Sequence, residues 1–365
     1  MERHLAASAA DFDALLGRLD QAGRAQPWMV QAMVELTYGC NLKCVHCYNP
    51  THEAKNELST EQIYRILDGL AAQGCLWIGF TGGELFTRRD VFEIFRYAKS
   101  LGFVISILTN ATLITPERAD QIRALNPYWV DVSIYGATAE TYEQVTQVPG
   151  SFAKFVKGVD LLQNRGIPMF LKLVLMTLNA HEFEAMREFA VSRRLRYQVG
   201  AEIHPKVDGS KEPLAYRLSP EQQFEIWRKI SGEQILENRR PSPEDALSQE
   251  EDRCGSAGQL FDCACGKSSA AITPHGKMNL CLSTYTPQYD LTTGTVAEGW
   301  ERLVSLVASL KPGQDYKCSG CELARHCTRG TGHGWMEQER FNGPCIPHFR
   351  ETAQRKAAFL KADRR

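Results

Sequence analysis

Residues 31–47, QAMVELTYGCNLKCVHC, decide the fold, because an apolar strand runs directly into three closely spaced cysteines. Cys40, Cys44 and Cys47 follow the strand after a short turn, with no fourth cysteine nearby. A cubane iron–sulfur cluster needs a ligand on each of four irons, so three thiolates leave one iron open to a group that is not protein. That is the ligand count of a catalytic cluster, and a partial zinc knuckle is the alternative.

Further along the chain, apolar strands alternate with helices. The helix after the first strand opens at Ser59, with Gln62 completing a capping box. Strands are expected at 31–37, 75–80, 103–108, 128–134, 169–176 and 196–200. Helices are expected near 90–101, 117–125, 151–165 and 182–193, and a later one is capped by Ser219 with Gln222.

Six strand–helix units in sequence favour parallel strands with helices outside them. An open, doubly wound sheet fits the same periodicity. Because the chemical motifs all follow strands, as at the mouth of a barrel, we expect a partial (β/α)6 TIM-like barrel with a loop-rich cluster-binding domain after it. The expected divisions are 1–30 (helical extension), 31–203 (barrel), 204–253 (linker with one helix), 254–345 (auxiliary-cluster domain) and 346–365 (C-terminal helix).

Composition narrows the function classes. The chain has 42 basic and 43 acidic residues, so it lacks the basic surface of a nucleic-acid binder. No apolar run approaches the ~20 residues that cross a bilayer, and acidic residues stand where a signal peptide would be apolar. We therefore expect no membrane association and a cytoplasmic location. Of 12 cysteines, all but Cys75 fall in two groups, 40–47 and 254–345, which indicates metal ligands rather than disulfides. Cys75 itself is expected to be a small buried hydrophobic residue.

The spacing C-x3-C-x2-C resembles the signature of the radical S-adenosylmethionine (SAM) superfamily. Thr81-Gly82-Gly83-Glu84, directly after the second strand, is similar to the turn that holds the SAM amino group in that family. Glycines allow a close backbone approach, and a carboxylate suits an ammonium. The resemblance implies a SAM-binding [4Fe–4S] cluster on the three cysteines.

The same resemblance extends to four further SAM contacts. Ser133 on the fourth strand and Lys172 on the fifth match residues that contact SAM in relatives, and His46 and Tyr48 flank the last cysteine, where relatives contact adenine. From the residues alone, Ser133 is equally a polar strand-end residue, and Lys172 a side chain that snorkels from the sheet.

The second cysteine group resembles the SPASM extension, which carries auxiliary [4Fe–4S] clusters. By that resemblance Cys318, Cys321, Cys327 and Cys345 form one complete ligand set, and Cys265 and Cys281 belong to another. The usual fourth ligand of the latter is absent, because position 331 is threonine; Cys254 or Cys263 could replace it. His333 is taken as a bystander, and a zinc ribbon is the alternative for the whole group.

The family resemblance implies reductive cleavage of SAM to a 5′-deoxyadenosyl radical, which abstracts a substrate hydrogen, with one or two auxiliary clusters relaying an electron. The expected substrate is a ribosomally made peptide or protein, modified by C–C or C–S bond formation or related chemistry. Alternatives are a small molecule in cofactor or tetrapyrrole synthesis, or a non-enzymatic electron carrier. An external electron donor such as flavodoxin or ferredoxin is an expected partner. A peptide substrate would need a separate peptide-recognition protein or would dock directly on the barrel mouth.

Residues for acid–base catalysis are less defined. Glu202, His204 and Asp208 follow the sixth strand and could include a general base, and Tyr135 and Asp131 are weaker candidates. Each is equally read as a polar linker or strand-end residue.

Overall fold

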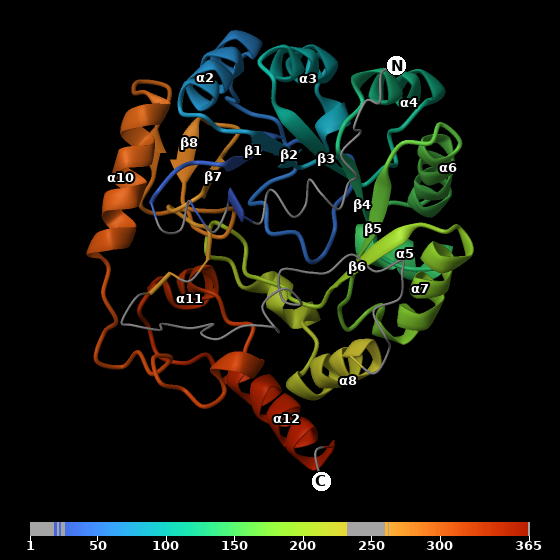
Figure 1. The fold of residues 1–365 in the computed structure, drawn as a ribbon. Helices are drawn as coiled ribbons and strands as arrows, with labels where there is room; N and C mark the ends of the chain where they lie inside the picture. Colours follow the sequence, from blue (N-terminus) through green and yellow to red (C-terminus); the bar gives the residue numbers. More distant parts are fainter. Residues whose placement is uncertain (1–17, 20–21, 23–25, 232–259, 262, 364–365) are drawn as a thin grey trace, which may run out of the picture.

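The computed structural model describes residues 18–19, 22, 26–231, 260–261 and 263–363. The expected N-terminal helix and Cys254 lie outside this part of the chain. Nine strands form one sheet in the order β6-β5-β4-β3-β2-β1-β7-β8-β9, and the first six curve through an open arc (Figure 1). They are β1 (Gln31–Thr37), β2 (Trp77–Gly82), β3 (Val104–Thr109), β4 (Trp129–Ile134), β5 (Met169–Val174) and β6 (Arg196–Gly200).

Parallel pairing joins each of these six strands to the next, and helices follow along the outside of the arc (Figure 1). The helices are α2 (Thr60–Ala72), α3 (Val91–Ser100), α4 (Pro116–Leu125), α5 (Ala139–Thr146), α6 (Ser151–Gln163) and α7 (Phe183–Ser192). The expected partial barrel is confirmed, and the doubly wound alternative is not what the chain forms.

The core lies between the sheet and these helices. Phe80 on β2 and Phe95 on α3 are fully buried with ring centroids 5.0 Å apart. Burial of one such side chain contributes about 1.5–3 kcal/mol, so this layer is the main source of stability. Ser59 and Gln62 form the expected capping box at α2, with the Ser59 N–H donating to Gln62 Oε1 at 2.8 Å.

Strand limits differ from the sequence prediction by up to two residues, and one helix was not expected. Strand β2 begins at Trp77 rather than Cys75, because the Cys75 N–H still closes the end of α2 on the Leu70 carbonyl. Cys75 is buried, as expected. Helix α5 was not expected; it is short, and Thr138 caps it by accepting from the Thr141 N–H at 3.3 Å.

The C-terminal segment continues the barrel sheet. Strand β7 (Ser269–Ile272) pairs in parallel with β1, and β8 (Lys277–Asn279) and β9 (Tyr289–Asp290) follow antiparallel. The expected hairpin around Gly276 is therefore present, but as an extension of the barrel. Helix α10 (Val296–Ser309) packs on α2, where a Cβ on Gly69 would lie 2.6 Å from Val296.

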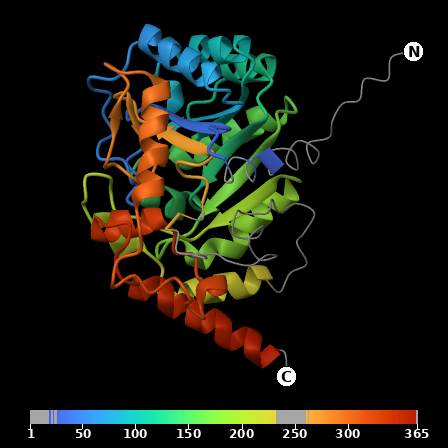
Figure 2. The same cartoon turned by 60° about the vertical axis from the view of Figure 1, so that its left-hand side comes forward.

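The remaining helices cover the open side of the arc. They are α8 (Pro220–Ser231), α11 (Thr331–Gln338) and α12 (Pro347–Asp363). Helices α8 and α12 pack together at the end of the molecule opposite α2 (Figure 2). None of the helices in the described part of the chain is long and apolar enough to span a bilayer. The domain limits expected from the sequence remain a prediction.

Candidate functional site

The loop that carries Cys40, Cys44 and Cys47 connects β1 to α2 and is tied to the end of α5. Backbone N–H groups of Lys43 and Val45 donate to the carbonyls of Thr146 and Val145, each at 3.0 Å. These bonds fix the loop at the carboxyl edge of the parallel strands, where barrel enzymes place their chemistry.

The three cysteines are partly buried, and negatively charged groups surround their thiols. Burial, together with the nearby Glu84 and Cys47, raises the pKa of Cys40 to about 12. Burial, then Cys47 and Cys40, raise the pKa of Cys44 well above its usual range. Thiolates crowded in this way need a bound cation to offset their repulsion, so the donor set fits a metal centre.

The distances among the thiols bear on which metal centre they suit. Within the described residues, the single group of three metal-ligating atoms lying within 4.8 Å of one another contains no cysteine. A tetrahedral zinc ion with Zn–S bonds of about 2.3 Å would need its thiolates about 3.8 Å apart. In the described part of the chain, the three thiols are therefore not held at the spacing of a zinc site.

The turn Gly82–Glu84 lies against the start of the cysteine loop. The Gly83 N–H donates to the Thr37 carbonyl at 2.7 Å, and the Glu84 N–H donates to the Gly39 carbonyl at 2.8 Å. A Cβ on Gly83 would lie 2.3 Å from the Gly39 carbonyl oxygen, and Gly82 has a φ of +135°. The two glycines are thus required for the approach of two backbone segments, in addition to any approach of a ligand.

Glu84 is 0% exposed, and hydrogen bonds engage both carboxylate oxygens. Oε1 accepts from the Phe86 N–H at 3.2 Å, Oε2 accepts from the Asn110 N–H at 2.8 Å, and the Thr109 hydroxyl lies about equally close to both. Burial raises the pKa of Glu84, and these donors counteract that rise. The carboxylate points into the protein, where it braces β2 against the end of β3.

Ser133 and Lys172 stand opposite each other on β4 and β5, and Gln198 on β6 is the next residue in the same row. Paired residues of parallel strands project from the same face. Lys172 is exposed and Ser133 half-buried, whereas the flanking positions on both strands are buried. The structure therefore places both predicted SAM contacts on the inner, open face of the barrel.

A buried carboxyl that sequence reasoning missed lies beside the last cysteine. The hydroxyl of Tyr48 donates to Glu35 Oε1 at 2.9 Å, and Tyr38 lies 3.4 Å from Oε2. Burial raises the pKa of Glu35 to about 7, although these tyrosines lower it. The Tyr48 hydroxyl is thus committed to Glu35, which leaves its ring for contact with a ligand.

His46 and Tyr135 lie together on the other side of the loop, with ring centroids 5.0 Å apart. Burial lowers the pKa of His46 to about 4, so the imidazole is neutral at neutral pH. Tyr135 also interacts with the Cys44 thiol, and its carbonyl accepts from Asn179 at 2.9 Å. Tyr135 is therefore buried near the three cysteines, where it is placed to pack against a bound group.

Comparison with known proteins agrees with this geometry. Residues 34–190 match the family model described as "Radical SAM superfamily". Residues 34–190 thus carry a radical SAM domain. The chain is 36% identical to the AdoMet-dependent heme synthase of Methanosarcina barkeri over 158 residues, 43% of this chain and 45% of that protein. That alignment thus spans less than half of the heme synthase.

A second relative aligns over nearly the whole chain. Mycofactocin maturase MftC of Mycolicibacterium smegmatis is 28% identical over 351 residues, 88% of each protein. The solved structure of Streptococcus suis SuiB bound to precursor peptide SuiA superposes with a TM-score of 0.70 at 14% identity, covering 93% of this chain and 81% of that chain. At 14% identity, the similarity to SuiB shows a shared fold.

Outside the radical SAM domain, three cysteines of the C-terminal segment lie in hydrogen-bonding contact. The Cys265 thiol interacts with Cys263 and Cys281, which raises the pKa of Cys265 and lowers that of Cys281. A Cβ on Gly332 would lie 3.5 Å from Cys281 Sγ, so the start of α11 borders this group. The Thr331 hydroxyl donates instead to the Leu260 carbonyl at 2.6 Å. The structure brings Cys263, and not Thr331, to the other two cysteines.

The last four cysteines also gather. Burial, together with nearby Cys345 and Cys318, raises the pKa of Cys327 to about 11. Burial, then Cys318 and Cys321, raises the pKa of Cys345. Arg329, 3% exposed, lies with Nη1 3.5 Å from Cys318 Sγ. A buried cation beside the group would partly neutralise four thiolates.

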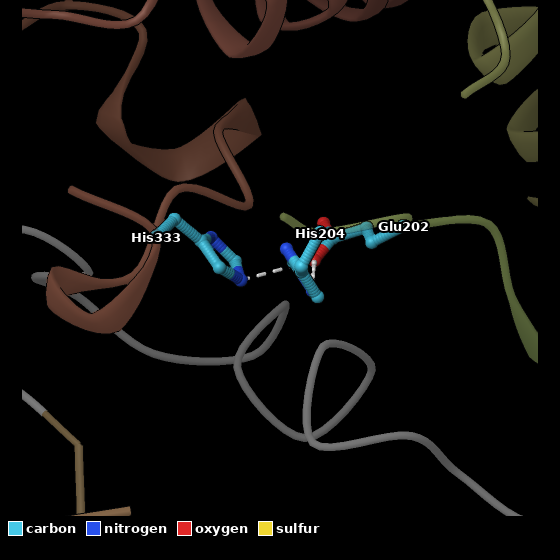
Figure 3. A group of neighbouring side chains, drawn as sticks. All are labelled: Glu202, His204 and His333. Carbon is cyan, nitrogen blue, oxygen red and sulfur yellow. Dashed lines mark ion pairs between the residues drawn. The ribbon is translucent and has the colours of Figure 1, made fainter. Parts of the chain in front are cut away.

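The structure also brings together three residues that the sequence left apart. Glu202 and His204 follow β6, and His333 on α11 lies beside them (Figure 3). Their ligating atoms lie within 4.8 Å of one another. Asp208, by contrast, accepts from the Ser210 N–H within its own exposed turn.

Proposed function

We propose that this radical SAM enzyme oxidatively modifies a ribosomally made peptide or protein. The observation that carries the proposal is the three-thiol loop, whose start is held by backbone hydrogen bonds from the Gly82–Glu84 turn. When bound there, a [4Fe–4S] cluster supplies the electron that cleaves SAM into methionine and a 5′-deoxyadenosyl radical.

The chain's own residues would then bind and orient the reactants. Cys40, Cys44 and Cys47 ligate three irons and leave the fourth for SAM. The amino group of SAM would meet the backbone of the turn, since the Glu84 carboxylate is engaged inside the protein. Lys172 supplies a cation for the methionine carboxylate, from the same strand row as Ser133.

A peptide substrate is favoured because the relative that aligns over 88% of both chains is a maturase. The fold also seats peptides, as the complex of SuiB with its precursor peptide illustrates. A tetrapyrrole substrate is the second candidate, and the 36% identity to a heme synthase within the barrel half supports it.

The second cysteine group is proposed to hold two auxiliary [4Fe–4S] clusters. Cys318, Cys321, Cys327 and Cys345 would ligate one, and Cys263, Cys265 and Cys281 the other, with Cys254 available as a fourth ligand. These clusters would accept the electron released when the product radical is oxidised. A flavodoxin or ferredoxin would reduce the SAM-binding cluster, and a separate protein could present the peptide.

The test is anaerobic reconstitution with iron and sulfide, followed by SAM and dithionite. We expect about twelve irons per chain and 5′-deoxyadenosine as a product. Cys44→Ala should lose about four irons and all 5′-deoxyadenosine, whereas Cys75→Ala, at a buried cysteine outside the groups, should keep both. Fully loaded wild type that forms no 5′-deoxyadenosine would overturn the enzyme assignment.

Substrate class is tested in the same reaction. Synthetic peptides encoded within a few genes of this one are added, and mass spectrometry follows the loss of hydrogen from each. Iron-coproporphyrin added in parallel tests the second candidate. Conversion of the porphyrin with no change in any peptide would replace the peptide proposal with the tetrapyrrole one.

A further inference from the structure

The group formed by Glu202, His204 and His333 lies outside the cysteine sites, and its geometry defines what it can do (Figure 3). His333 Nε2 lies 3.3 Å from Glu202 Oε2, and His204 Nε2 lies 4.0 Å from the same oxygen. The two imidazoles stack with centroids 4.6 Å apart and 20° between their planes. A carboxylate between two histidines can bind a divalent metal ion. It can equally act as a general base that accepts a proton.

The tautomer of His333 decides between these roles. The backbone N–H of Gly330, which can only donate, points at His333 Nδ1 at 2.9 Å. In a neutral imidazole one nitrogen accepts and the other carries the hydrogen, so Nε2 carries it here. That hydrogen faces Glu202, and the lone pair that a metal ion would need is absent. His333 therefore holds the carboxylate as a hydrogen-bond donor.

The surroundings keep both histidines neutral and the carboxylate available. Burial lowers the pKa of His333 to about 4 and that of His204 well below its usual range, while burial raises the pKa of Glu202. The side chains of Glu202, His204 and His333 retain 22%, 23% and 15% exposure, so a bound molecule can reach them. The other groups facing Glu202 are the Thr328 hydroxyl and the cations Lys172, Arg217 and Lys356.

Arg217 is already committed, since it pairs with Glu337 at 2.7 Å and donates to the Ile203 carbonyl at 2.8 Å. Lys172 comes from β5 and Lys356 from α12. These cations favour the ionised carboxylate at rest, against the desolvation that favours its protonated form. Because these two effects oppose each other, the Glu202 carboxylate is suited to gain a proton during a reaction.

The group also lies between the two kinds of cysteine site. Further along its segment the Val207 N–H donates to the Tyr48 carbonyl at 2.9 Å, next to Cys47. On the other side His333 follows Gly332, which borders Cys281. A substrate on the open face of the barrel, beside Lys172, would thus meet Glu202 on the side toward the auxiliary cysteines.

We propose that Glu202, positioned by His333 and His204, accepts the proton that the substrate loses as its radical is oxidised. This assignment rests on the proposed function. A substrate C–H bond breaks and its hydrogen atom joins the 5′-deoxyadenosyl radical. One electron then leaves for an auxiliary [4Fe–4S] cluster, a neighbouring X–H group gives its proton to Glu202, and a C–X bond forms. The substrate loses two protons and two electrons in total, one of each as the abstracted hydrogen atom.

The first test uses the cluster-loaded full chain without substrate. Equilibrium dialysis against Zn2+ should show no zinc retained beyond that of Glu202→Gln. In the oxidised loaded protein, 15N spectra of labelled histidine should show one neutral Nε2–H ring that His333→Gln removes. Zinc retained by wild type and lost in both variants, or an Nδ1–H tautomer at His333, would overturn the proposal in favour of a metal site.

The second test measures coupling with the peptide modified in the preceding assay. Glu202→Gln should form 5′-deoxyadenosine but at least ~10-fold less modified peptide per 5′-deoxyadenosine, given the 10²–10⁴ typical of general-base catalysis. Wild-type product formation should rise with pH through one ionisation that Glu202→Gln abolishes and Glu202→Asp partly restores. The matched control is Glu221→Gln, at an exposed glutamate of α8.

The two levels of proposal fail in different ways. Glu202→Gln with wild-type iron content and unchanged coupling would overturn the role of Glu202 alone. Absence of 5′-deoxyadenosine from wild type would overturn the proposed function and this assignment together.

Discussion

Replacement of Glu84 by glutamine tests whether this residue braces the barrel or binds a ligand. In the structure each carboxylate oxygen accepts one backbone N–H, from Phe86 on Oε1 and from Asn110 on Oε2. A glutamine side chain has one oxygen and one NH2 group, so either rotamer turns a donor toward a backbone donor. Thr109 can rotate its hydroxyl to accept, but a backbone N–H cannot.

The loss of folding stability follows from the number of hydrogen bonds that the glutamine cannot make. Glu84→Gln loses one hydrogen bond to a charged acceptor and leaves a buried N–H without a partner, which together cost about 2–3 kcal/mol. With an unfolding entropy of about 2.1 cal/mol/K per residue, the melting midpoint of the metal-free chain should fall by about 3–4 °C. Urea unfolding measures the free energy directly, and Glu93→Gln, on the exterior of α3, is the control.

A ligand role for Glu84 makes the opposite prediction. If the carboxylate acted only on SAM, Glu84→Gln would unfold like wild type in the absence of SAM and lose SAM affinity alone. An unchanged unfolding free energy with weakened SAM binding would refute the bracing role.

Three further predictions follow from close packing, burial and the cysteine groups. Gly83→Ala should lower the free energy of unfolding by about 1–3 kcal/mol and reduce iron loading of the loop, because the added Cβ meets backbone atoms. The control is Gly102→Ala, where φ is +89° and nothing lies within 4 Å of the added Cβ. It should lower the free energy of unfolding by about 1 kcal/mol and leave the iron count unchanged. Since the pKa of Glu35 rises from 4.5 to about 7 on folding, the folded chain holds this proton more tightly. The metal-free chain should therefore lose about 3 kcal/mol of stability as pH rises from 4.5 through 7, measured by urea unfolding, and Glu35→Gln should remove that loss. Cys263→Ser should lower the iron count by about four, whereas Cys75→Ser should not; an equal count in both would exclude Cys263 as a ligand.

Local sequence patterns predicted helices and strands well where a segment's own residues determine its conformation. The capping boxes at Ser59 and Ser219 formed as expected, because each needs only residues three apart. Strand β2 was misplaced by two residues, since its start depends on how α2 ends. The continuation of the barrel by β7 was not predictable, because strand pairing joins residues more than two hundred positions apart.

Site residues divide in the same way. Sequence by itself determined that three cysteines precede a glycine turn after the next strand, and with it the resemblance to the radical SAM superfamily. It also left a signal at His333, three residues after Gly330, which is the spacing of a helix cap. Only the tertiary structure decided that Glu84 faces inward, that Glu35 receives Tyr48, and that His333 meets Glu202. Those contacts form between segments that are distant in the sequence and that the sheet order and helix packing bring together. Local periodicity in the sequence does not indicate which distant segments will meet.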